Sequence, residues 1–178
     1  MKWLLACALV MSGMALAQVP PQVPKVTAAP IDPVTVKPGG SKPVQFEFRV
    51  APGFHINSNK PKSELLIPTV VNLDVPTNVS VAKLTYPAGQ DLAFEFSPDE
   101  KLSVYTGDFV VKAQVHTATA TPLGTYRVHG VLRFQACDNR ACYPPTFVPM
   151  YFDVTVAKSS KGSSATKKNP AQSPHIHD

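Results

Sequence analysis

Apolar and polar residues alternate along three stretches in the middle of the chain, at 44–50, 109–115 and 126–134. Successive side chains of a strand point to opposite faces of a sheet, so a period of two predicts strands with one buried face. Shorter apolar segments bounded by turn residues predict further strands at 34–36, 54–57, 65–73, 79–86, 92–96 and 147–156.

Proline-containing turn clusters separate these segments, and 19 prolines in 178 residues leave no room for a helix of ordinary length. About eight or nine short strands without alternating helices predict an all-β protein with antiparallel sheets. We expect an immunoglobulin-like antiparallel β-sandwich. A barrel or jelly roll is the alternative, because periodicity does not set the order of the strands.

The two ends of the chain differ from this central part. Residues 1–17 run from a basic start through an apolar stretch to Ala15-Leu16-Ala17, which is the order of a cleavable secretory signal peptide. Residues 18–33 form a Pro-rich leader, 34–157 the expected β-sandwich domain, and 158–178 a Lys/Ser-rich tail that is too polar to pack. We therefore expect a periplasmic or secreted protein that does not itself span a membrane.

The formal net charge of +5 comes largely from lysines of the tail, and the body of the chain is nearly neutral. Basic and aromatic residues do not interleave within the body, so we expect no nucleic-acid binding. No phosphate-cradling glycine loop or Ser-His-Asp arrangement is legible, which argues against nucleotide-binding and hydrolase functions. No cofactor or metal is expected.

The chain has three cysteines, and one of them, Cys7, lies in the predicted signal peptide. Cys137 and Cys142 remain as a pair in a compartment where disulfides persist. Asp138-Asn139 suits a tight turn, so the two cysteines should face each other across a hairpin with Cα atoms about 4.5 to 5.5 Å apart. A disulfide is feasible there.

Two hypotheses follow for this pair, a structural cross-link and a redox site. A cross-link that closes so short a loop contributes only about 2 kcal/mol in the chain-entropy model, which makes it a weak staple. Pro144 and Pro145 cannot donate to a strand ladder, which places the pair at an exposed end of the sandwich. Exposure is what thiol-disulfide exchange requires, because a thiolate must reach a sulfur.

The segment from Cys137 to Cys142 with Tyr143-Pro144-Pro145 after it, together with Gly-Phe-His-Ile-Asn-Ser-Asn-Lys-Pro at 53–61, resembles the N-terminal periplasmic domain of the thiol:disulfide interchange protein DsbD. The resemblance covers roughly residues 34–156. It implies an immunoglobulin-like fold whose cysteine pair takes electrons from a membrane reductant and passes them to thioredoxin-like periplasmic oxidoreductases. It also implies that Cys142 attacks the partner's disulfide and that Cys137 resolves the mixed disulfide.

The same resemblance implies an aromatic cap over the disulfide, and the matching stretch here is 94–100. Phe96 is the candidate shield, with an ordinary inward-facing strand aromatic as the alternative. We expect Tyr143, Pro144 and His55 to shape the site. His55 is a candidate for steering a proton to a departing thiolate, and a surface residue without a role is its alternative.

The chain departs from the family pattern in two ways. The loop between the cysteines is one residue shorter than in the best-known members, and the chain ends without their transmembrane segment and thioredoxin domain. We therefore expect a separate membrane electron carrier, and it stays open whether the chain is a protein-disulfide reductase component. The alternatives are a non-catalytic secreted immunoglobulin-like binding module with a structural disulfide, and a metal carrier that uses Cys137, Cys142, a histidine and Met150.

Overall fold

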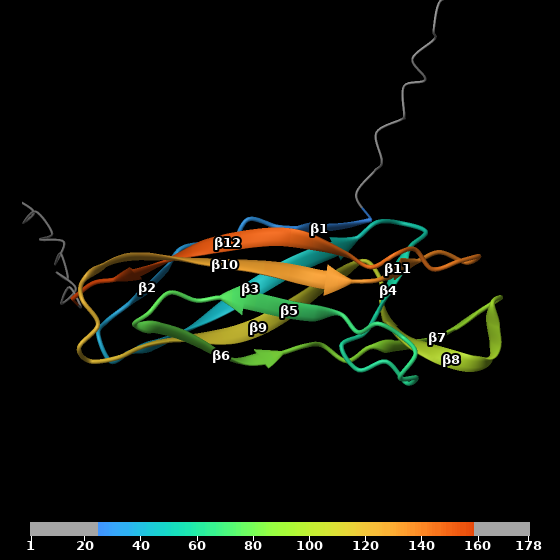
Figure 1. Cartoon of the computed structure of the whole chain (residues 1–178), viewed down its shortest axis with the longest axis horizontal. Helices are drawn as coiled ribbons and strands as arrows, with labels where there is room; N and C mark the ends of the chain where they lie inside the picture. The colour runs from blue at the N-terminus through green and yellow to red at the C-terminus, as the bar shows by residue number, and fades with distance from the viewer. Residues whose placement is uncertain (1–24, 159–178) are drawn as a thin grey trace, which may run out of the picture.

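The computed structural model describes residues 25–158 (Figure 1). The predicted signal peptide over 1–17 and the tail from 159 onward lie outside the described residues. The described part consists of strands joined by turns and loops, and no helix in it is long and apolar enough to cross a bilayer. The strands are β1 (Val26–Ala28), β2 (Val34–Val36), β3 (Ser41–Val50), β4 (His55–Asn57), β5 (Val70–Asp74), β6 (Val79–Thr85), β7 (Gln90–Phe94), β8 (Ser97–Tyr105), β9 (Asp108–Thr117), β10 (Gly124–Phe134), β11 (Ala136–Cys137) and β12 (Thr146–Val156).

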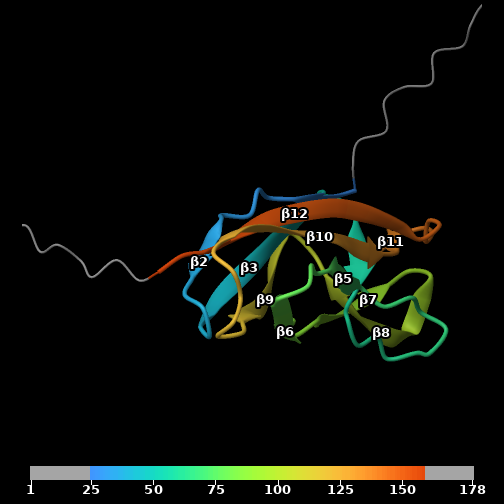
Figure 2. The same ribbon diagram turned by 60° about the vertical axis from the view of Figure 1, so that its left-hand side comes forward.

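Two four-stranded sheets form the body of the molecule. One has the order β1-β3-β9-β6 and the other β2-β12-β10-β5 (Figure 2). Their inner faces meet in one core, where the rings of Phe46 on β3 and Phe152 on β12 lie 5.7 Å apart. The neighbouring strands pair antiparallel, except that β2 runs parallel to β12. The predicted immunoglobulin-like β-sandwich is confirmed.

The predicted two-residue period is visible in the burial of the long strands. Along β3, Val44, Phe46, Phe48 and Val50 are buried and the residues between them are exposed. Strand β9 repeats the pattern from Phe109, because its alternate side chains face the same core. The strands predicted at 44–50, 109–115 and 126–134 are therefore confirmed.

Two of the shorter predicted strands differ from the structure. The prediction at 65–73 was wrong for its first half, because β5 begins only at Val70 and Leu65 is 93% exposed. Pro68 cannot donate to a ladder, which fits a loop there. The stretch predicted as one strand at 92–96 instead contains the end of β7 and the turn into β8, a strand that the period did not reveal because its first half is polar and exposed.

The packed part of the chain begins earlier than the sequence predicted. Strand β1 lies within the segment predicted as a Pro-rich leader over 18–33, yet it pairs with β3, and Val26 is buried against the core. Three residues are too few to show a period, which is why the pattern was silent here. The leader assignment does not describe β1, and the rest of the predicted division of the chain stays a prediction.

A third, smaller sheet lies at one end of the sandwich, on the right in Figure 1. Its order is β11-β4-β8-β7. Strand β11 belongs to the segment that connects β10 to β12, so this sheet ties the tip of that connection to β4 and to the β7–β8 hairpin. This end of the molecule carries the cysteine pair.

Candidate active site

The two cysteines form a disulfide at the tip of the β10–β12 connection. The sulfur atoms are 2.03 Å apart, and the Cα atoms are 3.9 Å apart, which is closer than the spacing predicted for a hairpin pair. Cys137 and Cys142 form a direct antiparallel bridge. Cys137 ends β11 and is fully buried, whereas Cys142 is exposed. The disulfide therefore joins one cysteine that is accessible to solvent, Cys142, to one that is not, Cys137.

The loop between the cysteines is folded around the side chain of Asp138. Its Oδ1 accepts hydrogen bonds from the backbone N–H groups of Arg140 (2.8 Å) and Ala141 (2.9 Å), and its own N–H donates to the Ala141 carbonyl at 3.0 Å. The Tyr143 hydroxyl donates to Oδ2 at 2.6 Å. These donors lower the pKa of Asp138 to about 2, and the carboxylate in turn raises the pKa of Tyr143.

Tyr143 joins the loop to the first residues of the described chain. Its backbone N–H donates to the Ala136 carbonyl at 2.8 Å. The Lys25 ammonium lies 3.2 Å from the centre of the Tyr143 ring, and the Phe54 ring lies at a tilt 6.0 Å away. A cation over an aromatic face is attracted by the ring quadrupole, so Lys25 helps to hold Tyr143 in place.

Gln135 connects the same loop to β4. Its Nε2 donates to the Tyr143 carbonyl at 3.2 Å, and its Oε1 accepts from the Asn57 side chain at 3.4 Å. Asn57 is fully buried and also donates to the Ile67 carbonyl at 3.0 Å. Pro144, a predicted site residue, is exposed beside this network.

His55 lies directly opposite Cys137 in the pairing of β4 with β11. It is 2% exposed, so it is a buried residue and not a surface one. Its Nε2 is buried without a hydrogen-bond partner. Burial lowers the pKa of the His55 imidazole, and the negative charge of Asp138 acts in the opposite direction.

The aromatic cover of this end comes from the β7–β8 hairpin. The Phe94 ring stacks on His55 with centroids 3.8 Å apart, whereas the Phe96 ring lies 6.3 Å from His55 and 5.5 Å from Phe94 and is 40% exposed. The sequence pointed to Phe96 as the candidate shield, whereas the ring that stacks on His55 is that of Phe94. The sequence did hold a signal for Phe94. Phe94 and Phe96 are two positions apart, and side chains at that spacing along a strand point to the same face.

Met150, named in the metal-carrier alternative, is packed into the core on β12 opposite Gly130. Within residues 25–158, no three side chains of His, Cys, Asp or Glu cluster as metal ligands would.

The chain matches the model of a known protein family, and this match agrees with the geometry of the site. The family described as "Thiol:disulfide interchange protein DsbD, N-terminal" matches residues 22–147. The chain belongs to this family. The resemblance seen in the Cys-Tyr-Pro-Pro motif is thereby confirmed, and membership of the DsbD N-terminal family together with the disulfide supports thiol-disulfide interchange over a non-catalytic binding module.

Solved structures of DsbD N-terminal domains are similar to this chain at low sequence identity. The reduced domain from Neisseria meningitidis is 26% identical, with a TM-score of 0.35, over 63% of this chain and 75% of that one. The complex of DsbD and PilB N-terminal domains from the same organism is 20% identical, with a TM-score of 0.40, over 62% of this chain and 73% of that one. The N-terminal periplasmic domain of ScsB from Proteus mirabilis is 20% identical, with a TM-score of 0.45, over 72% of this chain and 44% of that one. No curated protein matches the chain.

Proposed function

We propose that this DsbD N-terminal domain is a periplasmic relay that passes electrons from a membrane reductant to thioredoxin-like oxidoreductases. Cys137 and Cys142 cycle between the dithiol and the disulfide. The observation that supports this is the disulfide itself, which joins an exposed Cys142 to a fully buried Cys137 at one end of the sandwich.

The difference in exposure between Cys137 and Cys142 supports different roles for the two cysteines. In the reduced protein, the thiolate of Cys142 attacks one sulfur of the partner's disulfide, and the partner's other sulfur leaves as a thiolate. Cys137 then attacks the Cys142 sulfur, which re-forms the Cys137–Cys142 bond and releases the partner's second thiolate. Two electrons pass to the partner in this cycle. Cys142 acts first because an exchange partner must reach the attacking sulfur.

The surroundings of the pair support repeated opening and closing. Asp138 accepts hydrogen bonds from the backbone N–H groups of Arg140 and Ala141, and these contacts do not involve the sulfur atoms. The pairing of β11 with β4 holds Cys137 from the other side. The two sulfurs therefore stay close after reduction, which makes the resolving step an intramolecular one.

The partner class and the source of electrons belong to the same proposal. Thioredoxin-like proteins present an accessible disulfide of the kind that Cys142 attacks. A separate membrane electron carrier restores the dithiol by the reverse exchange. The solved complex of the DsbD and PilB N-terminal domains from Neisseria meningitidis is an example of a domain of this family bound to a second protein.

The experiment is a trap for the mixed disulfide. In the Cys137→Ala variant the resolving thiol is missing, so a covalent adduct between Cys142 and a thioredoxin-like partner should accumulate and should disappear on reduction. The matched control is Cys142→Ala, which should trap nothing. Separation of the adducts on a non-reducing gel, followed by mass spectrometry, identifies the partner.

A redox titration of the wild-type protein complements the trap. A disulfide that is used for exchange should have a reduction potential above about −300 mV, whereas a structural disulfide lies below that value. A potential far below that limit, together with no adduct in Cys137→Ala, contradicts the proposed function.

A further inference from the structure

The buried half of the redox pair lies opposite a histidine whose Nε2 makes no hydrogen bond. Cys137 and His55 are direct partners across β11 and β4, and their exposed fractions are 0% and 2%. Directly opposed residues of an antiparallel pair extend to the same face, with Cβ atoms about 4.5 to 5.5 Å apart. The imidazole therefore lies next to Cys137, and its Nε2 is a buried polar atom without a partner.

An unpartnered buried nitrogen costs free energy, since folding removes it from water without replacing the lost hydrogen bond. The cost is explained if the nitrogen is used when the disulfide opens. In the mixed disulfide Cys137 is a thiol, and it must lose its proton before it can attack Cys142. Burial disfavours a free thiolate, and Cys137 has no exposed surface through which water could take that proton.

We propose that His55 accepts the thiol proton of Cys137 in the resolving step, a role that rests on the proposed function. As the proton moves to the imidazole, the Cys137 sulfur forms its bond to the Cys142 sulfur. The bond between Cys142 and the partner breaks, and the partner's sulfur leaves with the electron pair. The imidazolium then gives its proton to that thiolate or to water. In the reverse exchange, the imidazolium protonates Cys137 as it leaves.

The groups around His55 suit a proton acceptor. Burial keeps the imidazole neutral at neutral pH, so that it can accept, and the Asp138 charge stabilises the imidazolium once it forms. The β7–β8 hairpin presents the rings of Phe94 and Phe96, which do not titrate. The titratable side chain that β8 brings to β4 is Tyr105, which lies opposite Ile56. The Tyr105 hydroxyl donates to the Asn59 side chain.

The test separates the two chemical steps with a chromogenic disulfide. The full chain carries Cys7→Ser, so that Cys137 and Cys142 are its only cysteines. The reduced protein is mixed with one equivalent of 5,5′-dithiobis(2-nitrobenzoic acid), and the released thionitrobenzoate is followed by absorbance. Attack by Cys142 gives the first release, and resolution by Cys137 gives the second. In this Cys7→Ser parent protein, the second rate should rise with pH and level off above the pKa of His55.

The variant His55→Phe keeps a ring that can stack on Phe94 but removes the proton acceptor. Its first phase should be unchanged, and its second phase should be about 100-fold slower at neutral pH, the usual range for loss of a general base. The second rate should then rise with pH without levelling off. His55→Gln retains a polar side chain that cannot take the proton and should show the same profile, which decides the question if His55→Phe does not fold.

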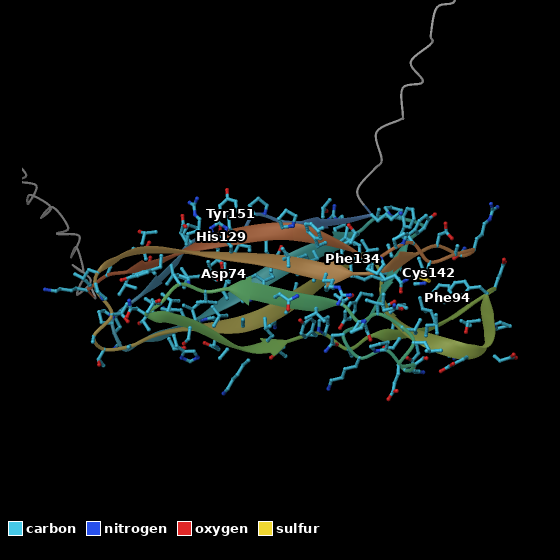
Figure 3. All side chains as sticks on the ribbon, viewed as in Figure 1. Asp74, Phe94, His129, Phe134, Cys142 and Tyr151 are labelled. Carbon is cyan, nitrogen blue, oxygen red and sulfur yellow. A yellow bond between two sulfur atoms is a disulfide. The ribbon has the colours of Figure 1, made fainter. Side chains whose placement is uncertain are left out.

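The matched control is His129→Phe, an exposed histidine on β10 that lies away from Cys142 (Figure 3). Both of its phases should match the parent protein. A second phase of parental rate and pH profile in a folded His55 variant overturns the inference and leaves the proposed function intact. If the parent protein itself shows no second phase, the proposed function fails instead.

Discussion

Asp138 organises the loop between the cysteines through hydrogen bonds to its carboxylate. It accepts two backbone N–H groups within the loop and the hydroxyl of Tyr143 just after it. Asn and Asp side chains often close turns in this way. Because the carboxylate is the acceptor in each case, the geometry of the loop depends on its ionised form. The lowered pKa of Asp138, about 2, follows from these same contacts.

At this scale we predict that Asp138→Ala loosens the loop without unfolding the sandwich. The backbone amides of Arg140 and Ala141 lose their acceptor, so their hydrogen exchange should become roughly tenfold faster or more. Exchange measured by NMR at these two amides is the test. Asp99→Ala, an exposed Asp→Ala change on β8, is the matched control and should leave both amides unchanged.

The same residue predicts how the loop responds to pH. The folded pKa of Asp138 lies below its ordinary value of 3.8, so the stabilisation is fully present above pH 3.8 and is lost only as the pH falls through about 2. Protection of the Ala141 amide at pH 4 should therefore equal that at pH 7, after correction for the intrinsic exchange rate. Loss of protection between these two values would contradict this assignment.

Two groups of elements surround the site: one holds the cysteines, and the other covers His55. The β10–β12 connection carries the cysteines, and β4 anchors it through pairing with β11. The β7–β8 hairpin covers His55 with Phe94, and Figure 3 shows Phe94 at the same end of the molecule as Cys142. A hairpin that packs through aromatic rings has to move to expose what lies beneath it. We propose that access to the buried side of the disulfide depends on this hairpin, because Phe94 covers His55, which lies opposite Cys137.

We predict that Phe94→Ala speeds reduction of the disulfide by a small phosphine reductant by about two- to tenfold, the equivalent of losing one aromatic pair. Phe96→Ala is the comparison, because Phe96 lies farther from His55 and is partly exposed. It should have a smaller effect. If Phe96→Ala has the larger effect, Phe96 is the shield that the family resemblance implied, and the assignment to Phe94 is wrong.

At the scale of the whole molecule, the redox site and the hydrophobic core occupy different places. The core runs between the two four-stranded sheets, where Phe46, Leu132 and Val154 are fully buried. The disulfide lies at one end, and its cysteines are separated by only 5 positions in sequence. A bond that closes so short a loop restricts the unfolded chain less than one that closes a long loop. The fold should therefore persist in both redox states, as a relay requires.

We predict that reduction lowers the free energy of unfolding by no more than about 2 kcal/mol, the chain-entropy value for this loop. Denaturant unfolding of the oxidised and reduced Cys7→Ser protein measures the difference. Leu132→Ala provides the scale, since truncation of a fully buried leucine costs about 2 to 5 kcal/mol. Unfolding of the reduced protein without denaturant would show that the disulfide is a structural cross-link.

Long strands and the cysteine motif were the most predictable features. A strand such as β3 buries alternate side chains, so apolar and polar residues alternate along its sequence and predict the strand. Short strands such as β1, and polar ones such as the first half of β8, carry no such period, because their pairing depends on strands that are distant in the chain. Tyr143 and Pro144 could be named as candidates from the motif, whereas Phe94 could not.

The sequence by itself determined the all-β class, the cysteine pair and the family, because periodicity and a short motif are local properties. Only the tertiary structure decided that Cys137 is buried while Cys142 is exposed, and that His55 and Phe94 lie beside the buried half. These neighbours come from separate strands, β11, β4 and β7. Contact between them depends on strand order and register, which side-chain periodicity does not encode.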